Sequence, residues 1–108
     1  MQNYPRSNGS NIIEDDFPGY LGKRKNIEFS LNSGLRIEMR PPENIKVSDL
    51  LTKFMIKLKV SENLIDDKIF FLFNGCRIRK NDERNTIELG MSDGASIIVI
   101  DSNAIIEG

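Results

Sequence analysis

A chain of 108 residues with 15 basic and 16 acidic side chains has room for one folded domain and a short tail. Its net charge of −1 gives no reason to expect nucleic acid or an anionic membrane surface as the main partner. The chain contains no histidine, which removes histidine-dependent nucleophiles, general bases and almost every familiar zinc site, and no apolar run approaches the ~20 residues needed to cross a bilayer.

Cysteine usage and the first residues indicate where the protein works. Cys76 is the single cysteine, so an internal disulfide is impossible and a reducing compartment is expected. The polar stretch from Met1 to Ser10 lacks the apolar segment of a secretory signal. We therefore expect an intracellular protein, cytoplasmic and/or nuclear.

Residues 1–25 form the first segment, which is rich in Asn, Gly, Ser, Pro and charge. This composition buries too little apolar surface to offset the entropy of ordering, which predicts a tail that is flexible or held by a partner. Residues 12–16 within it form an apolar-acidic string. That string could add as a strand to a partner's sheet, or it could be a sticky patch on an ordinary tail.

Period-two alternation begins after this tail. Over residues 27–31, and again over 35–40, apolar side chains alternate with polar ones, and Asn32-Ser33-Gly34 between them supplies turn chemistry. The pattern predicts a β-hairpin. Pro41-Pro42 ends it, because proline has no N–H for a strand ladder.

From Val47 the apolar spacing becomes helical. Leu50, Phe54 and Leu58 lie four residues apart, and charged residues fall on the other side. This predicts an amphipathic α-helix of about three turns, with Ser48 as its N-cap. An apolar stripe at this spacing indicates core packing and no cofactor.

The second half of the chain predicts further strands. Residues 69–73 form an apolar run closed by Asn74-Gly75, a short strand is expected around residues 77–79, and residues 97–100 form a final apolar strand. The order is hairpin, helix, strand, short element, strand. A helix packed across one face of a mixed sheet is the α+β arrangement for that order.

The sequence of this second half resembles that of SUMO and, more distantly, ubiquitin. The similarity rests on Leu72-Phe73-Asn74-Gly75, followed at similar spacing by Glu88-Leu89-Gly90-Met91, and on the strand over residues 97–100. It covers residues 26–101, with residues 102–108 left as a short C-terminal tail. The resemblance implies an α+β, ubiquitin-like β-grasp domain, with a mixed sheet of four to five strands and one main helix across one face. It also implies function through protein surfaces.

Many members of this superfamily are conjugated to targets through a C-terminal diglycine. Carrying the register forward from the last strand puts Ile105-Ile106 where ubiquitin and SUMO have Gly-Gly. β-branched residues are stiff and bulky, unsuited to threading a narrow enzyme channel. Gly108 is the remaining candidate terminus for conjugation.

SUMO-like proteins hold partner peptides in a groove between the second strand and the helix. The resemblance places that peptide groove at five residues: Ile37, Met39, Arg40, Lys53 and Lys57. Glu38 stands where the family favours a basic residue, which disfavours peptides with acidic flanks. The alternative is that Ile37 and Met39 simply face the core.

The far side of the sheet is expected to be mostly apolar. If Phe71, Ile97 and Val99 face the helix, as the family pattern implies, the intervening residues point away from it. These are Phe70, Leu72, Ile98 and Ile100. An apolar patch of this kind is unusual on a free monomer, so we expect it to be covered. The cover is a stable partner, a second copy, or the tail folding back through Ile12, Ile13 and Phe17. We favour a partner.

The sequence therefore predicts a non-enzymatic, noncovalent protein-interaction module, a subunit of a larger assembly that binds through this apolar face. The alternative is a SUMO-like or ubiquitin-like modifier conjugated through Gly108. An enzyme is disfavoured because we find no acid-base pair on a recognisable scaffold, no phosphate-binding glycine loop and no metal-ligand cluster. No cofactor and no small-molecule substrate are expected.

Overall fold

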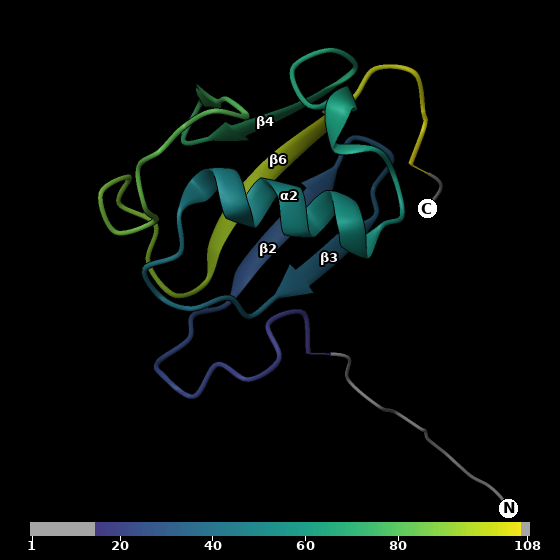
Figure 1. Cartoon of the computed structure of the whole chain (residues 1–108). Helices are drawn as coiled ribbons and strands as arrows, with labels where there is room; N and C mark the ends of the chain where they lie inside the picture. The colour runs from purple at the N-terminus through teal and green to yellow at the C-terminus, as the bar shows by residue number, and fades with distance from the viewer. Residues whose placement is uncertain (1–14, 107–108) are drawn as a thin grey trace, which may run out of the picture.

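The computed structural model describes residues 15–106. In chain order the elements are β2 (Ile27–Leu31), β3 (Arg36–Met39), α2 (Val47–Lys57), the 3-10 turn η1 (Glu62–Leu64), β4 (Ile69–Phe73), β5 (Cys76–Ile78) and β6 (Ala95–Asp101). The strands form one five-stranded sheet in the order β3-β2-β6-β4-β5. Strands β2 and β6 run parallel and the other neighbours antiparallel, so the sheet is mixed. Helix α2 lies across one face (Figure 1), which confirms the predicted β-grasp class.

Both hairpins close at the predicted turn residues. Between β2 and β3, the N–H of Gly34 donates to the Leu31 carbonyl (2.9 Å). Between β4 and β5, Asn74 and Gly75 both have positive φ values, 53° and 77°. A two-residue hairpin turn with right-handed twist requires this, which explains the choice of Asn-Gly.

Helix α2 begins at Val47, and its N-cap is Lys46, which makes no side-chain capping bond. The prediction that Ser48 caps the helix is wrong, because Ser48 lies inside its first turn. The first N–H groups of the helix have no acceptor within the helix and bond to a distant loop instead. The N–H of Val47 donates to the Arg84 carbonyl (2.8 Å) and that of Ser48 to the Asp82 carbonyl (3.2 Å). A loop distant in sequence therefore caps the helix, and no local pattern could reveal this.

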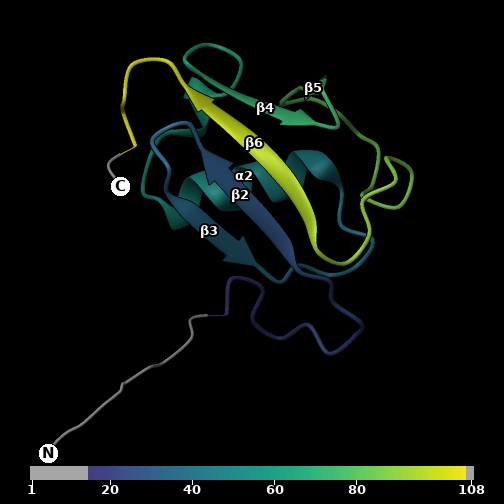
Figure 2. The same cartoon turned by 180° about the vertical axis from the view of Figure 1, so that it is seen from behind.

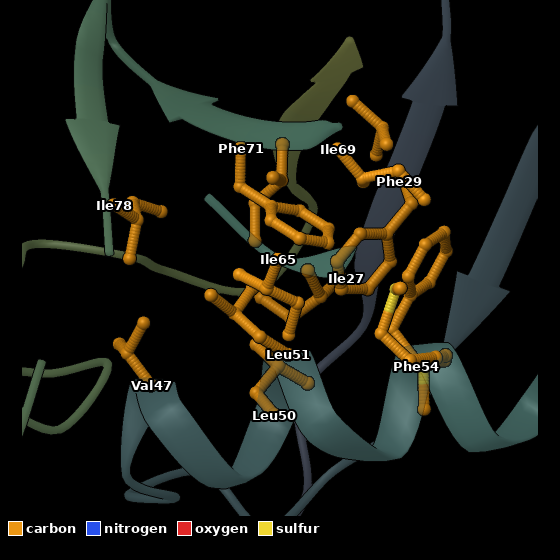
Figure 3. Close-up of a cluster of buried hydrophobic side chains, with 14 of the residues drawn as sticks. Ile27, Phe29, Val47, Leu50, Leu51, Phe54, Ile65, Ile69, Phe71 and Ile78 are labelled. Atoms are coloured by element: carbon orange, nitrogen blue, oxygen red, sulfur yellow. The ribbon is translucent and has the colours of Figure 1, made fainter. Parts of the chain in front are cut away.

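The core lies between α2 and the sheet (Figure 3). Its centre is three phenylalanines, one each from β2, α2 and β4. Phe29 stacks on Phe54 with ring centroids 4.2 Å apart, and Phe71 meets both rings edge-on at 6.2 and 5.6 Å. Aromatic pairs in these geometries add about 0.5–1.5 kcal/mol each beyond their buried area. The aromatic cluster therefore fixes the helix against the two strands.

Candidate functional site

The face of the sheet opposite α2 carries the predicted apolar patch. In the antiparallel register of β4 and β6, Phe70 lies opposite Ile100 and Leu72 opposite Ile98. Their neighbours Phe71, Ile97 and Val99 are fully buried on the α2 side. Strand alternation therefore places Phe70, Leu72, Ile98 and Ile100, here called the outer-face cluster, on the face opposite α2. In Figure 2 this face of the sheet is nearer the viewer and α2 lies behind it.

The outer-face cluster is half open to solvent and has a polar rim. Ile98 is 47% exposed, and the other three side chains are half-buried. The Arg77 guanidinium lies 4.6 Å from the Phe70 ring centroid and forms an ion pair with Asp66 (3.1 Å), on the β5 side. Ser30 of β2 lies opposite Ile98 on the other side. An apolar centre with a polar rim is the usual anatomy of a protein-protein interface.

The outer-face cluster is smaller than the sequence led us to expect. On the same face, β2 and β3 present polar or charged side chains: Glu28, Ser30, Arg36 and Glu38. The apolar surface is thus confined to β4 and β6, and the expectation that most of this face is apolar is wrong. The reason is that β2 and β3 are buried on one face only, whereas the alternate residues of β4 and β6 are apolar on both.

Four of the five residues of the predicted peptide groove belong to the α2 side of the sheet, namely Ile37, Met39, Lys53 and Lys57. Met39 is buried opposite Ile27, and Ile37 is half-buried opposite Phe29, so both face the core as the alternative interpretation stated. Arg40 follows β3 and is exposed, whereas Lys53 and Lys57 belong to α2. Met39 is therefore in the core, whereas Ile37, Lys53 and Lys57 lie on the α2 side of the sheet, and we call the surface of these three residues the α2–β3 surface.

A segment of the expected tail packs against this surface. We call residues 15–20 the N-terminal strap. The Phe17 side chain is only 9% exposed and joins the buried core, with the Lys53 ammonium 5.7 Å from its ring centroid. Asp16 forms an ion pair with Lys57 (3.1 Å). Phe17 therefore does not cover the outer-face cluster, which lies on the opposite layer.

Arg24 fastens the strap. Its guanidinium donates to both carboxylate oxygens of Asp15 (2.8 and 3.2 Å) and to the carbonyls of Phe17 (3.0 Å), Tyr20 (2.9 Å) and Arg40 (3.1 Å). The hydrogen bond from Arg24, and next the one from the Phe17 N–H, hold the pKa of Asp15 below its usual value of 3.8. Sequence reasoning missed Arg24, because most of its acceptors are backbone carbonyls.

No family model matches the chain, and no curated protein gives a significant sequence match. Solved structures are similar to it in fold. The ubiquitin-like domain of Plasmodium falciparum Dsk2 has a TM-score of 0.58 at 17% identity, over 71% of this chain and 96% of that one. Caldiarchaeum subterraneum ubiquitin has a TM-score of 0.60 at 20% identity, over 72% and 92%. A ubiquitin-like domain of an Arabidopsis thaliana protein has 0.58 at 18%, over 87% and 92%. The chain has the ubiquitin-like β-grasp fold.

After β6, this ubiquitin-like fold continues into a C-terminal turn that is bound to the domain. The buried carboxylate of Asp101 accepts the backbone N–H groups of Ile105 (2.9 Å) and Ile106 (2.6 Å). The Ile106 side chain is 5% exposed and joins the core. Asn32 accepts the Asp101 N–H at 3.0 Å. Gly108 lies outside the described residues, so its role as a conjugation terminus stays a prediction.

Within residues 15–106 of the ubiquitin-like fold, no group of three or more histidine, cysteine, aspartate or glutamate side chains is placed to hold a metal ion. Cys76 is exposed at the start of β5. In the same range, no helix is long and apolar enough to span a bilayer.

Proposed function

We propose that this chain is a non-enzymatic, noncovalent protein-interaction module that works as a subunit of a larger protein assembly. The observation that carries the proposal is the outer-face cluster: four large apolar side chains in register on two neighbouring strands, with polar residues around them. Contiguous apolar patches on a soluble domain usually mark an interaction site. The exposed, unpaired Cys76 suits a reducing compartment, so we propose a cytoplasmic and/or nuclear protein.

Burial of the outer-face cluster supplies part of the free energy that specific binding needs. Fully burying one large apolar side chain contributes roughly 1.5–3 kcal/mol. Three of the four side chains are already half-buried, so the gain on binding comes most of all from Ile98. Several kcal/mol must first offset the lost freedom of the partners, and a productive interface therefore has to bury the cluster together with its rim.

The C-terminal turn favours the noncovalent interaction module over the conjugated modifier. A tail that threads a conjugating enzyme must be extended and free. Here Ile106 is in the core and its N–H is bound by Asp101, so threading would require both contacts to break. A modifier that is ligated through Gly108 would have to break both contacts each time it is conjugated.

A paired substitution tests the outer-face cluster. Leu72→Asp combined with Ile98→Asp puts two carboxylates on the patch, and it should abolish assembly while the far-UV circular dichroism stays native. Ile87→Asp is the matched control, because Ile87 is an exposed isoleucine outside the sheet. Assembly that persists in the double variant, or that is lost equally in the control, would refute this placement of the interface.

Sizing of native cell extract separates the two functions. Fractions are resolved on a denaturing gel and probed for this protein. We expect a single band near 12.3 kDa in high-mass native fractions, lost to the monomer position in the double variant. A ladder of larger bands that survives denaturation, and that disappears when Gly108 is deleted, would establish the conjugated modifier instead.

A further inference from the structure

A cleft of about 600 Å³ lies at the end of the sheet where the parallel strands β2 and β6 begin. Its walls come from the residues before β2, the loop before α2 and the segment that leads into β6 (Figure 1). Charged residues of both signs line it, Lys23 and Lys25 with Glu43 and Asp93, together with the apolar residue Ile87. This size, with a few polar groups around an apolar contact, is typical of small-molecule sites.

Backbone hydrogen bonds hold the walls of the cleft together. The Lys25 N–H donates to the Pro41 carbonyl (3.1 Å). The Glu43 N–H donates to the Lys23 carbonyl (3.0 Å). On the other side, the Asp93 carboxylate accepts the N–H of the residue that follows Lys25 (2.6 Å). The walls are therefore ordered before a ligand arrives, which lowers the entropic cost of binding.

Lys25 brings a buried positive charge to this cleft. The residue is only 7% exposed, and its ammonium donates to the Met91 carbonyl. An ammonium has three N–H donors, and a buried charge without a counter-charge is costly. None of the ion pairs within residues 15–106 includes Lys25, although Glu43 and Asp93 line the same cleft. The described part of the chain therefore supplies no counter-charge to this ammonium.

We propose that the cleft binds a small monocarboxylate with an apolar chain. The carboxylate of the ligand accepts the remaining donors of the Lys25 ammonium, in a charge-assisted hydrogen bond. Lys23 adds to the positive potential, and Ile87, which is 57% exposed, offers an apolar contact to the chain of the ligand. This site goes beyond the proposed function, because it takes a small molecule at one end of the sheet and no protein on the outer face.

The other charges of the cleft favour a ligand with a single negative charge. Glu43 and Asp93 repel an anion more strongly when it carries two charges than when it carries one. Arg24 also lines the cleft, but its guanidinium is bound to Asp15 and to backbone carbonyls of the strap and of Arg40. The lysines are therefore the cations left for the ligand, and a monocarboxylate matches them better than sulfate does.

The test is an NMR titration of the full chain with hexanoate. We expect saturable shifts of the Lys25 and Met91 amide signals. Hexanamide has nearly the same shape without the charge, and sulfate has charge without the apolar chain. Each should bind at least about tenfold more weakly than hexanoate, because each loses one of the two kinds of contact.

Lys25→Met assigns the binding to the ammonium, since it removes the charge and keeps an apolar side chain of similar length. The affinity for hexanoate should fall at least about tenfold while the amide signals stay dispersed as in a folded domain. Lys68→Met is the matched control, because Lys68 is an exposed lysine that does not line the cleft, and it should bind hexanoate as the wild type does.

Four results would overturn the proposal. In the wild type, these are the absence of saturable shifts at about 10 mM hexanoate, hexanamide binding as tightly as hexanoate, and sulfate binding as tightly as hexanoate. The fourth is an unchanged affinity in folded Lys25→Met. If that variant does not fold, the comparison of the three compounds on the wild-type chain decides alone.

Discussion

The C-terminal turn depends on one buried carboxylate, and the substitution Asp101→Ala tests how the end of the domain is held. Both oxygens of Asp101 accept backbone N–H groups, from Ile105 and Ile106. In the variant, the turn either keeps two unpaired donors or opens and takes the Ile106 side chain out of the core. When the turn opens, water hydrogen-bonds to the two N–H groups. The loss in the free energy of unfolding therefore equals the cost of the less costly alternative.

The magnitude follows from these contacts. A hydrogen bond to a charged group contributes roughly 1.5–3 kcal/mol, and we expect Asp101→Ala to cost about 2 kcal/mol. Ile106→Ala should cost a similar amount, about 2 kcal/mol, the lower end of the range for removing a buried isoleucine, because a chain end can relax into the space. Each of the two substitutions loosens the same turn. The double variant should therefore lower the free energy of unfolding by about 2–3 kcal/mol, which is less than the sum of the two single losses.

Urea unfolding followed by circular dichroism measures these free energies. Asn103→Ala is the control, an exposed residue of the same turn whose loss should change the free energy of unfolding by less than about 0.5 kcal/mol. Two outcomes would refute the reasoning: a cost for Asp101→Ala no larger than that of the control, or strict additivity of the two single variants. Either would mean that Asp101 does not hold Ile106 in the core.

Two further predictions concern the core and the strap. Phe54→Ala should lower the free energy of unfolding by about 3–5 kcal/mol, because it leaves a cavity against Phe29 and Phe71; thermal unfolding measures this, and a loss below about 1 kcal/mol would contradict the aromatic cluster. Because the pKa of Asp15 is lowered in the folded state, its bond to Arg24 is fully present above the usual value of 3.8 and is lost as the pH falls through the lower folded-state pKa. An NMR titration of the Phe17 amide should therefore show a transition only below pH 3.8, absent in Asp15→Asn, and a transition at higher pH would contradict it.

Periodicity predicted the parts of the fold in which side-chain direction is local. Alternation along β4 and β6 was enough to separate Phe71 from Phe70 and Leu72, because a strand allows each residue only two directions. The helical stripe placed Phe54 in the core for the same kind of reason. The start of α2 was not predictable in this way, since its caps are carbonyls of residues 82 and 84, more than thirty positions away.

The burial of Phe17 and Ile106 near the two chain ends was not predicted, because it depends on contacts with residues distant in the sequence. The composition around Phe17 is that of a tail, and its burial depends on cations from α2 and on Arg24, none of which forms a local pattern with it. At the other end, Ile105-Ile106 was interpreted as an obstacle to threading. The structure adds a positive role for Ile106, as a core residue positioned by Asp101.

These contacts bear on which surface is available to a partner. The α2–β3 surface is covered by the strap, whose aromatic anchor is buried and whose carboxylates are paired. In the outer-face cluster the Arg77 guanidinium lies over the Phe70 ring, and Ile98, next to β2, is the most open of the four side chains. A partner that meets the folded domain gains apolar burial at once on β4 and β6, whereas on the α2 side it must first displace Phe17. We therefore propose the outer-face cluster as the site where a partner first meets the domain.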